Sequence, residues 1–530
     1  MIDKIPYFIL QPIMSLGDKW SWFGNKLNAF AINSIVNVSR HRPHPWSTAH
    51  DYVSWTSLTD QRFSARHLPA KRLPNLPDPA QLVGLFQQSP ANQILSTKST
   101  CLFPAFAQYL TDGFIRTRMP DTSAGETDDV RRQTTSNHQI DMCPLYGRLP
   151  KQTDALRLKS ESRGERGRLK SQFIGDEEYA PFLYEGKAIK TEFIDLDKPL
   201  GLDRILAILA DPVLHSDPDE VRSRIFAFGG DRANAAPQVA MMNTLFLREH
   251  NRLAGDIERA HQDWGDERVF QTARNSLIVL FIKIVVEEYI NHISPSFRFR
   301  ANPSVAWNAP WNKPNWMTTE FSLLYRWHSL IPNTIGWNGK PYPLIMTLMN
   351  NRPLLDAGLA IAFSNMSSQN AGKLGAFNTA KALLHLEEDA IKQGRQCDLA
   401  TYSDYREYVS LSRPKDFSDI SGDPEVVAFL KNAYKSVNDI DFYVGLFAED
   451  NVINSPLPPL LLRLVAVDAF SQALTNPLLS EHVFNVDTFS KPGWEAIQNT
   501  HTLRDILTRN CPAELGNSPI SMTVSNWKRA

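Results

Sequence analysis

Helical spacing of apolar residues from about residue 205 onward most constrains the fold of this 530-residue chain. Apolar side chains recur there every three or four residues, and we find no convincing run with the two-residue alternation of a half-buried strand. Thirty-five prolines against 25 glycines favour many short helices joined by rigid loops. With 42% hydrophobic residues, the chain has enough apolar material for one large core. The sequence therefore predicts a mainly α fold.

No Gly/Ser linker, internal repeat or heptad run divides the chain, so we expect one main domain over residues 46–530. Residues 1–45 are rich in bulky apolar side chains, including Trp20 and Trp22, with Lys19 and Lys26 among them. Short amphipathic helices of this composition suit a membrane interface. Aromatic stripes also commonly pack on a protein's own core. Both interpretations stay open for residues 1–45.

Charge and cysteine content exclude several classes of protein. Lysine plus arginine (56) nearly balances aspartate plus glutamate (57), which gives no electrostatic reason to expect a nucleic-acid partner. Four scattered cysteines lack metal-ligand spacing and fit reduced thiols. We therefore expect a cytoplasmic protein, peripheral on the membrane if residues 1–45 bind lipid. The longest apolar stretch, residues 277–286, contains Lys283, is shorter than the roughly 18 residues that span a bilayer, and predicts a buried helix.

The segment 320–332 carries the strongest chemical signal. Its pattern predicts a helix in which Tyr325 and His328, three residues apart, share one face. A histidine can hold a haem iron and leave the opposite side of the metal open to oxygen or peroxide. A tyrosine one turn away can be oxidised by that iron to a radical that removes hydrogen from a substrate. Because an isolated Tyr-x-x-His in a core helix usually only packs, this interpretation needs support from the rest of the chain.

That support comes from a family resemblance. Residues 320–332 resemble the proximal helix of the peroxidase–cyclooxygenase superfamily, on its cyclooxygenase and fatty-acid dioxygenase branch. Further segments resemble this family in the same order along the chain: 49–55, 243–254, 264–274, 393–395 and 405–408. Several motifs in register make a strong signal. The resemblance implies a cyclooxygenase-like haem peroxidase domain, and the lack of the cysteine-rich module of animal cyclooxygenases favours a bacterial member.

The resemblance also assigns residues to the distal side of the haem. Gln108 matches the family's distal glutamine, but Asp112 stands where cyclooxygenases carry a histidine that moves a proton during O–O cleavage. Asp112 either takes over that proton transfer or faces away and leaves a degenerate site. Arg232 matches a distal arginine that can stabilise a peroxide anion, and the alternative is an ordinary loop salt bridge.

The same comparison implies how the cofactor is held. His328 is expected to be the ligand of the haem iron, with Trp327 packed beside it. Ala235 stands where some relatives form an ester to the haem, which implies a non-covalent haem b. A calcium site is doubtful, because Asp141 is present but Gly113 occupies the position of its acidic partner.

The implied substrate channel departs from the family pattern. Ser471, preceded by a phenylalanine, matches the serine that lines the cyclooxygenase channel. Ser296 replaces a tyrosine that helps to hold the substrate carboxylate. The arginine used there has no exact match, although Arg40 and Arg42 lie nearby in the sequence.

The resemblance implies a haem-dependent oxygenase in which a radical on Tyr325 oxygenates an unsaturated fatty acid or similar lipid, with O2 or H2O2 as the second substrate. Two alternatives stay open: a plain peroxidase that oxidises small donors at the haem edge, and a non-catalytic haem-binding module. Pairing of two chains into a homodimer is also left open.

Overall fold

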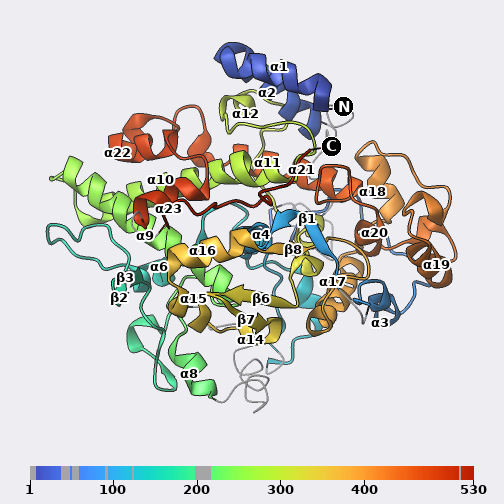
Figure 1. Cartoon of the computed structure of the whole chain (residues 1–530), viewed down its shortest axis with the longest axis horizontal. Helices are drawn as coiled ribbons and strands as arrows, with labels where there is room; N and C mark the ends of the chain where they lie inside the picture. Colours follow the sequence, from blue (N-terminus) through green and yellow to red (C-terminus); the bar gives the residue numbers. More distant parts are fainter. Residues whose placement is uncertain are drawn as a thin grey trace.

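Helices make up most of the computed structural model, as the sequence predicts (Figure 1). The structure describes residues 7–37, 48–49, 59–89, 93–121, 124–196, 217–511 and 515–529. Its α-helices are α1 (Tyr7–Lys19), α2 (Ser21–Val36), α3 (Pro79–Leu82), α4 (Leu102–Phe114), α5 (Cys143–Tyr146), α6 (Pro150–Leu156), α8 (Pro218–Ser223), α9 (Pro237–Ala260), α10 (Asp266–Ile284), α11 (Asn291–Ile293), α12 (Ser304–Trp307), α13 (Thr319–Leu324), α14 (Leu344–Thr347), α15 (Arg352–Ala357), α16 (Leu359–Ser368), α17 (Leu384–Gln396), α18 (Tyr402–Tyr408), α19 (Pro424–Ala433), α20 (Phe442–Ala448), α21 (Pro459–Leu474), α22 (Val486–Gln498) and α23 (Leu503–Asn510).

Strands are short and pair two by two within the part of the chain that the structure describes. All four pairs are antiparallel: β1 (Leu95–Thr100) with β8 (Asn370–Gly372), β2 (Gln172–Ile174) with β3 (Glu177–Tyr179), β4 (Tyr184–Glu185) with β5 (Ala188–Ile189), and β6 (Thr334–Trp337) with β7 (Lys340–Pro343). The β1–β8 pair joins residues about 270 positions apart and lies next to α4.

The core is built around α9 and α10, which pack against each other. α9 begins with Pro237 at its first turn, where proline removes no helical hydrogen bond, and is buried over most of its surface. α10 continues through one π-helical turn, Val285–Ile290, into α11. The run Asp266–Ile293 is long and apolar enough to cross a membrane by length and composition, but 78% of its most apolar window is buried inside the molecule. This agrees with the buried helix predicted for residues 277–286.

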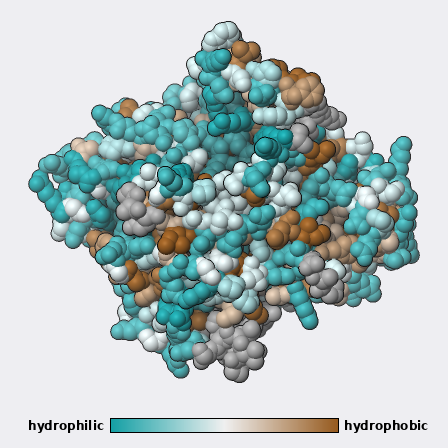
Figure 2. Space-filling model, in the orientation of Figure 1, coloured by the Kyte–Doolittle hydropathy of each residue, from teal (hydrophilic) through white to brown (hydrophobic). Residues whose placement is uncertain are grey.

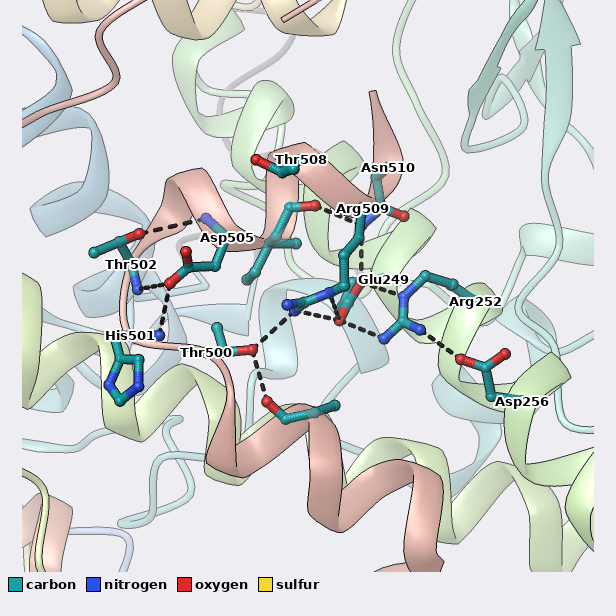
Figure 3. A network of polar contacts seen from close by, with 12 residues as sticks. Glu249, Arg252, Asp256, Thr500, His501, Thr502, Asp505, Thr508, Arg509 and Asn510 are labelled. Carbon is teal, nitrogen blue, oxygen red and sulfur yellow. Dashed lines mark hydrogen bonds and ion pairs between the residues drawn. The ribbon is translucent and has the colours of Figure 1, made fainter. Parts of the chain in front are cut away.

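A buried carboxylate fastens α23 to α9 (Figure 3). Glu249 of α9 accepts hydrogen bonds from Arg252 at 2.8 and 2.9 Å, from Arg509 at 2.7 Å and from Asn510 at 2.8 Å. Burial alone would raise the pKa of Glu249, but the bonds and charges of the two arginines hold that pKa below its ordinary value. Hydrogen bonds that converge from Arg252, Arg509 and Asn510 thus allow an ionised group to remain in the core.

The N-terminal helices α1 and α2 lie together at one edge of the molecule (Figure 1). They cross closely at Gly17 and Gly24, where a Cβ on Gly24 would meet the Gly17 carbonyl oxygen. The inner face of α2 is fully buried at Ile32 and Val36. The outer surface exposes Phe8 at 74%, Trp20 at 67%, Trp22 at 68% and Phe30 at 58%. Figure 2 shows apolar surface among hydrophilic residues at this edge. The predicted boundary at residue 45 lies outside the described residues.

Candidate active site

The prediction of one continuous helix over residues 320–332 is wrong. α13 is capped by Thr318, whose side chain accepts a hydrogen bond from the Phe321 N–H at 3.1 Å, and it ends at Leu324. After a break, a single 3₁₀ turn follows at His328–Leu330. Pro332 disfavours any helix that would continue through the residue before it.

Aromatic packing accounts for the break itself. The indole of Trp327 stacks on Phe103, with 5.4 Å between ring centroids, and on Tyr325, at 4.8 Å. Such aromatic pairs contribute about 1 kcal/mol each, more than the helix propensity that one residue supplies. Tyr325 and His328 still line the same cavity, although no regular helix connects them.

His328 is held from behind by a buried carboxylate. Its Nδ1 lies 3.1 Å from Oε1 of Glu387 in the first turn of α17, within ion-pairing distance, although the ring is not aligned for a straight hydrogen bond. This leaves Nε2 as the ring nitrogen available to the cavity. A histidine oriented by a carboxylate on one nitrogen and open on the other is the usual arrangement of a metal ligand.

Tyr325 is half-buried, and its hydroxyl oxygen is buried. Its ring makes an edge contact with Phe321, at 4.9 Å between centroids, besides the stack on Trp327. Burial raises the pKa of the Tyr325 phenol well above its ordinary value, and the neighbouring Tyr289 hydroxyl opposes part of that rise. Tyr325 therefore keeps its proton at physiological pH, so any oxidation of this side chain has to remove an electron and a proton together.

Gln108 and Asp112, one turn apart on α4, both line this cavity, so Asp112 does not face away. The Asp112 carboxyl is buried, and its Oδ1 lies 3.8 Å from Nη1 of Arg232. Burial raises the pKa of Asp112 to about 6, against the lowering effect of Arg232, Arg116 and Arg326. A carboxyl group with that pKa can both take and return a proton near neutral pH.

The cavity has a volume of about 340 Å³. It is lined by all the residues predicted for the haem site: His328, Tyr325, Trp327, Ala235, Gln108, Asp112 and Arg232. It also contains Arg326, whose Nε is buried without a hydrogen-bond partner among the described residues. The guanidinium group of Arg326 gives the cavity cationic charge suited to a carboxylate of a haem. With the open His328 nitrogen, this donor set fits haem.

Residues 88–520 match the sequence model of a protein family described as animal haem peroxidase. The chain belongs to this family. As a member, it is a haem-dependent oxidoreductase.

Individual relatives of the chain lie on the cyclooxygenase branch of this family. The chain is 28% identical to prostaglandin G/H synthase 1 of Rattus norvegicus over 490 residues, which cover 89% of this chain and 75% of that protein. It is 27% identical to prostaglandin G/H synthase 2 of Equus caballus over 513 residues, 92% of this chain and 79% of that one.

Solved structures share the fold at lower identity. The fatty acid alpha-dioxygenase of Oryza sativa superposes with a TM-score of 0.70 at 16% identity, covering 99% of this chain and 94% of that one. Peroxidase A of Dictyostelium discoideum superposes with a TM-score of 0.66 at 20% identity, covering 91% and 95%. These neighbours support the cyclooxygenase-like architecture expected from the sequence.

A second, apolar cavity of about 60 Å³ lies between α2, the π-helical turn and α21. Ser296 lines it, as does Phe470, but Ser471 does not. The Ser471 hydroxyl donates instead to carbonyl oxygens of its own helix, at 2.9 Å to Val467 and 3.0 Å to Asp468. The structure therefore does not place Ser471 on this cavity. Arg40 and Arg42 lie outside the described residues.

The Asp141 carboxylate, considered for calcium, makes two hydrogen bonds within the chain. It accepts from Asn137 Nδ2 at 2.6 Å and from the Cys143 N–H at 3.0 Å. Over the described ranges, no group of three or more His, Cys, Asp or Glu side chains could hold a metal ion.

Sequence reasoning missed Arg326 and Arg463, which line the two cavities. It also missed Glu387 and Tyr289, which lie outside the cavities and interact with His328 and Tyr325. The sequence did carry a signal for two of them. Arg326 is a charged residue inside the Tyr-Arg-Trp-His motif, and Arg463 interrupts the apolar pattern of α21 and lines the apolar cavity. No local signal marked Glu387, because its partner is 59 positions away in the chain.

Proposed function

We propose that this protein is a haem b-dependent dioxygenase that uses a radical on Tyr325 to oxygenate an unsaturated fatty acid or a similar lipid. The observation that carries the proposal is that Tyr325 and His328 line one cavity while the Tyr325 hydroxyl oxygen is buried. The similarity to proteins named as prostaglandin synthases and as a fatty acid alpha-dioxygenase supports the class of substrate.

The side chains divide the work. His328 would hold the haem iron through Nε2, and Ala235 lines the cavity without a group that could bond to the haem. Bound haem supplies the redox chemistry, namely reduction of peroxide and removal of one electron from a neighbouring side chain. Asp112 takes a proton from hydrogen peroxide and returns it to the leaving oxygen, while Arg232 stabilises the peroxide anion.

Tyr325 then carries the radical. Loss of one electron and the phenolic proton gives a neutral radical, which removes a hydrogen atom from a weak C–H bond of the lipid and becomes a phenol again. O2 adds to the carbon radical, and the peroxyl radical regains a hydrogen atom from Tyr325. The sum is addition of O2 to one C–H bond, with the tyrosyl radical restored. Burial protects the radical from water and from side reactions.

Tyr325→Phe tests this proposal. The substitution removes only the phenolic oxygen, so packing and haem binding should persist. We expect oxygen uptake with a panel of unsaturated fatty acids to be lost, while oxidation of small peroxidase donors continues. Tyr342→Phe on β7, outside the cavity, is the matched control and should retain oxygen uptake. Full lipid oxygenation by Tyr325→Phe would rule out the radical mechanism.

A plain peroxidase is the second candidate, favoured by the buried Asp112 beside Arg232. That function needs proton transfer at the haem but no protein radical. Donor oxidation without lipid oxygenation in the unmodified protein, over the whole fatty-acid panel, would select it. Haem binding with neither activity would select the non-catalytic module.

We also propose that α1 and α2 bind the surface of a lipid membrane. Their exposed aromatic side chains lie beside lysine, with Nζ of Lys26 4.3 Å above the Trp22 ring, and α2 borders the apolar cavity through Ser34 and Ile35. Tryptophan and lysine together suit the boundary between headgroups and acyl chains. A lipid substrate could then pass from the membrane to the apolar cavity beside α2 without crossing water.

A further inference from the structure

We propose that Glu387 is a positioning residue that attracts the Nδ1 proton of His328 and so strengthens the bond from His328 to the haem iron. The inference rests on the proposed role of His328. It goes further, because Glu387 lies outside the cavity and would control how much electron density His328 donates to the iron.

Three elements fix the Glu387 carboxylate behind the His328 ring. Glu387 is buried in the first turn of α17, where the helix dipole favours an anion. Its Oε1 accepts a hydrogen bond from the Thr379 hydroxyl at 2.8 Å and lies 3.1 Å from His328 Nδ1. Its Oε2 accepts a hydrogen bond from the Tyr443 hydroxyl of α20. The carboxylate therefore has little freedom to turn away from His328.

A structural role alone does not require the charge. In a glutamine the amide oxygen could accept from the Thr379 hydroxyl, while the amide NH2 could donate to the Tyr443 oxygen, whose own proton can turn to the Arg326 carbonyl oxygen at 3.4 Å. Burial of a carboxylate, by contrast, costs several kcal/mol unless a partner compensates it. The charge of Glu387 acts on two groups beside it: His328, whose Nδ1 lies 3.1 Å away, and the Arg326 guanidinium, whose pKa it raises against the lowering effect of burial. Both belong to the haem cavity.

The chemical effect has a definite direction. A carboxylate 3.1 Å from Nδ1 attracts the proton on that nitrogen, which gives the imidazole more anionic character and makes its Nε2 a stronger donor to a metal. A stronger donor favours the ferric over the ferrous state and lowers the reduction potential. It also raises the iron–histidine stretching frequency.

Two substitutions in the full-length holoprotein should shift these properties in opposite directions. Glu387→Gln keeps the shape but removes the charge, so the iron–histidine stretch should fall and the ferric/ferrous midpoint potential should rise. Tyr443→Phe removes one donor from the carboxylate, which leaves it a stronger acceptor for His328, so the stretch should rise and the potential should fall. Resonance Raman spectroscopy and spectroelectrochemistry measure both quantities without any substrate.

Glu388→Gln is the matched control. It makes the same charge change one residue along α17, where the carboxylate pairs with Lys392 at 2.6 Å, and should leave both quantities unchanged. Wild-type values in a haem-loaded Glu387→Gln protein would overturn the inference. If that variant does not retain haem, Tyr443→Phe decides: a shift in the predicted direction supports the role of Glu387, and no shift or the opposite shift overturns it.

Failure of the inference and of the proposed function can be told apart. His328→Ala should lose the haem absorption band or show the spectrum of free haem. If His328→Ala keeps the wild-type spectrum, the proposed ligand is wrong and the function falls with it. If His328→Ala loses the band while Glu387→Gln and Tyr443→Phe match wild type, only the role of Glu387 is rejected.

Discussion

At the scale of single residues, the role in peroxide cleavage proposed for Asp112 predicts a dependence on pH. Because burial raises the pKa of Asp112 to about 6, the carboxylate form that takes a proton is formed only as the pH rises through that value. We expect the rate of the reaction with hydrogen peroxide, followed by stopped-flow absorbance, to rise through about pH 6 and then level off. Asp112→Asn should lower the rate by about 10²- to 10⁴-fold and remove this pH dependence. The charged groups that affect Asp112 are Arg232, Arg116, Asp231 and Arg326. Since the charge of Asp231 raises the pKa of Asp112, Asp231→Asn should move the rise to lower pH. An Asp112→Asn profile equal to that of wild type would show that another group moves the proton.

At the scale of elements, the buried Glu249 holds α9 and α23 together. Glu249→Gln leaves Arg252 and Arg509 without their carboxylate, and we expect a loss of about 3 kcal/mol in the free energy of unfolding at pH 7. The pKa of Glu249 is lower in the folded chain than the value of about 4.3 in the unfolded chain, so its contribution is complete above about pH 4.3 and is lost as the pH falls through the folded value. The difference between wild type and variant in urea or thermal unfolding should therefore shrink below about pH 4. The control Glu192→Gln, which breaks a surface pair with Lys170, should cost under about 1 kcal/mol. Equal stability of Glu249→Gln and wild type at pH 7 would contradict this account.

At the scale of the whole molecule, the α1–α2 edge carries the predicted membrane contact. Replacing both Trp20 and Trp22 with serine removes the two exposed tryptophans but leaves the buried face of α2 unchanged. We expect this variant to lose flotation with liposomes and to keep the haem spectrum, since the haem cavity is lined by other elements. Phe173→Ser on β2, where the side chain is 72% exposed, should float like wild type. Flotation of the tryptophan variant at the wild-type level would assign the exposed aromatics no role in membrane binding.

Local patterns in the chain were enough to predict the helical architecture, the buried helix over residues 277–286 and the family, because helix periodicity and short motifs depend on neighbouring residues. The same patterns placed Tyr325, His328, Gln108, Asp112 and Arg232 in one site through their resemblance to the family, and the cavity contains all five. Their roles remain predictions that the variants above test.

Long-range packing was needed for the rest. The helix through residues 320–332 breaks after Leu324 because Trp327 stacks on Phe103, a ring more than 200 positions away. Glu387 meets His328 because α17 and the 3₁₀ turn converge, and Ser471 turns to its own helix because nearby carbonyls accept its hydroxyl. Sequence periodicity records which face of a segment is buried but not which distant residue it meets, since that choice depends on the total free energy of the packed core.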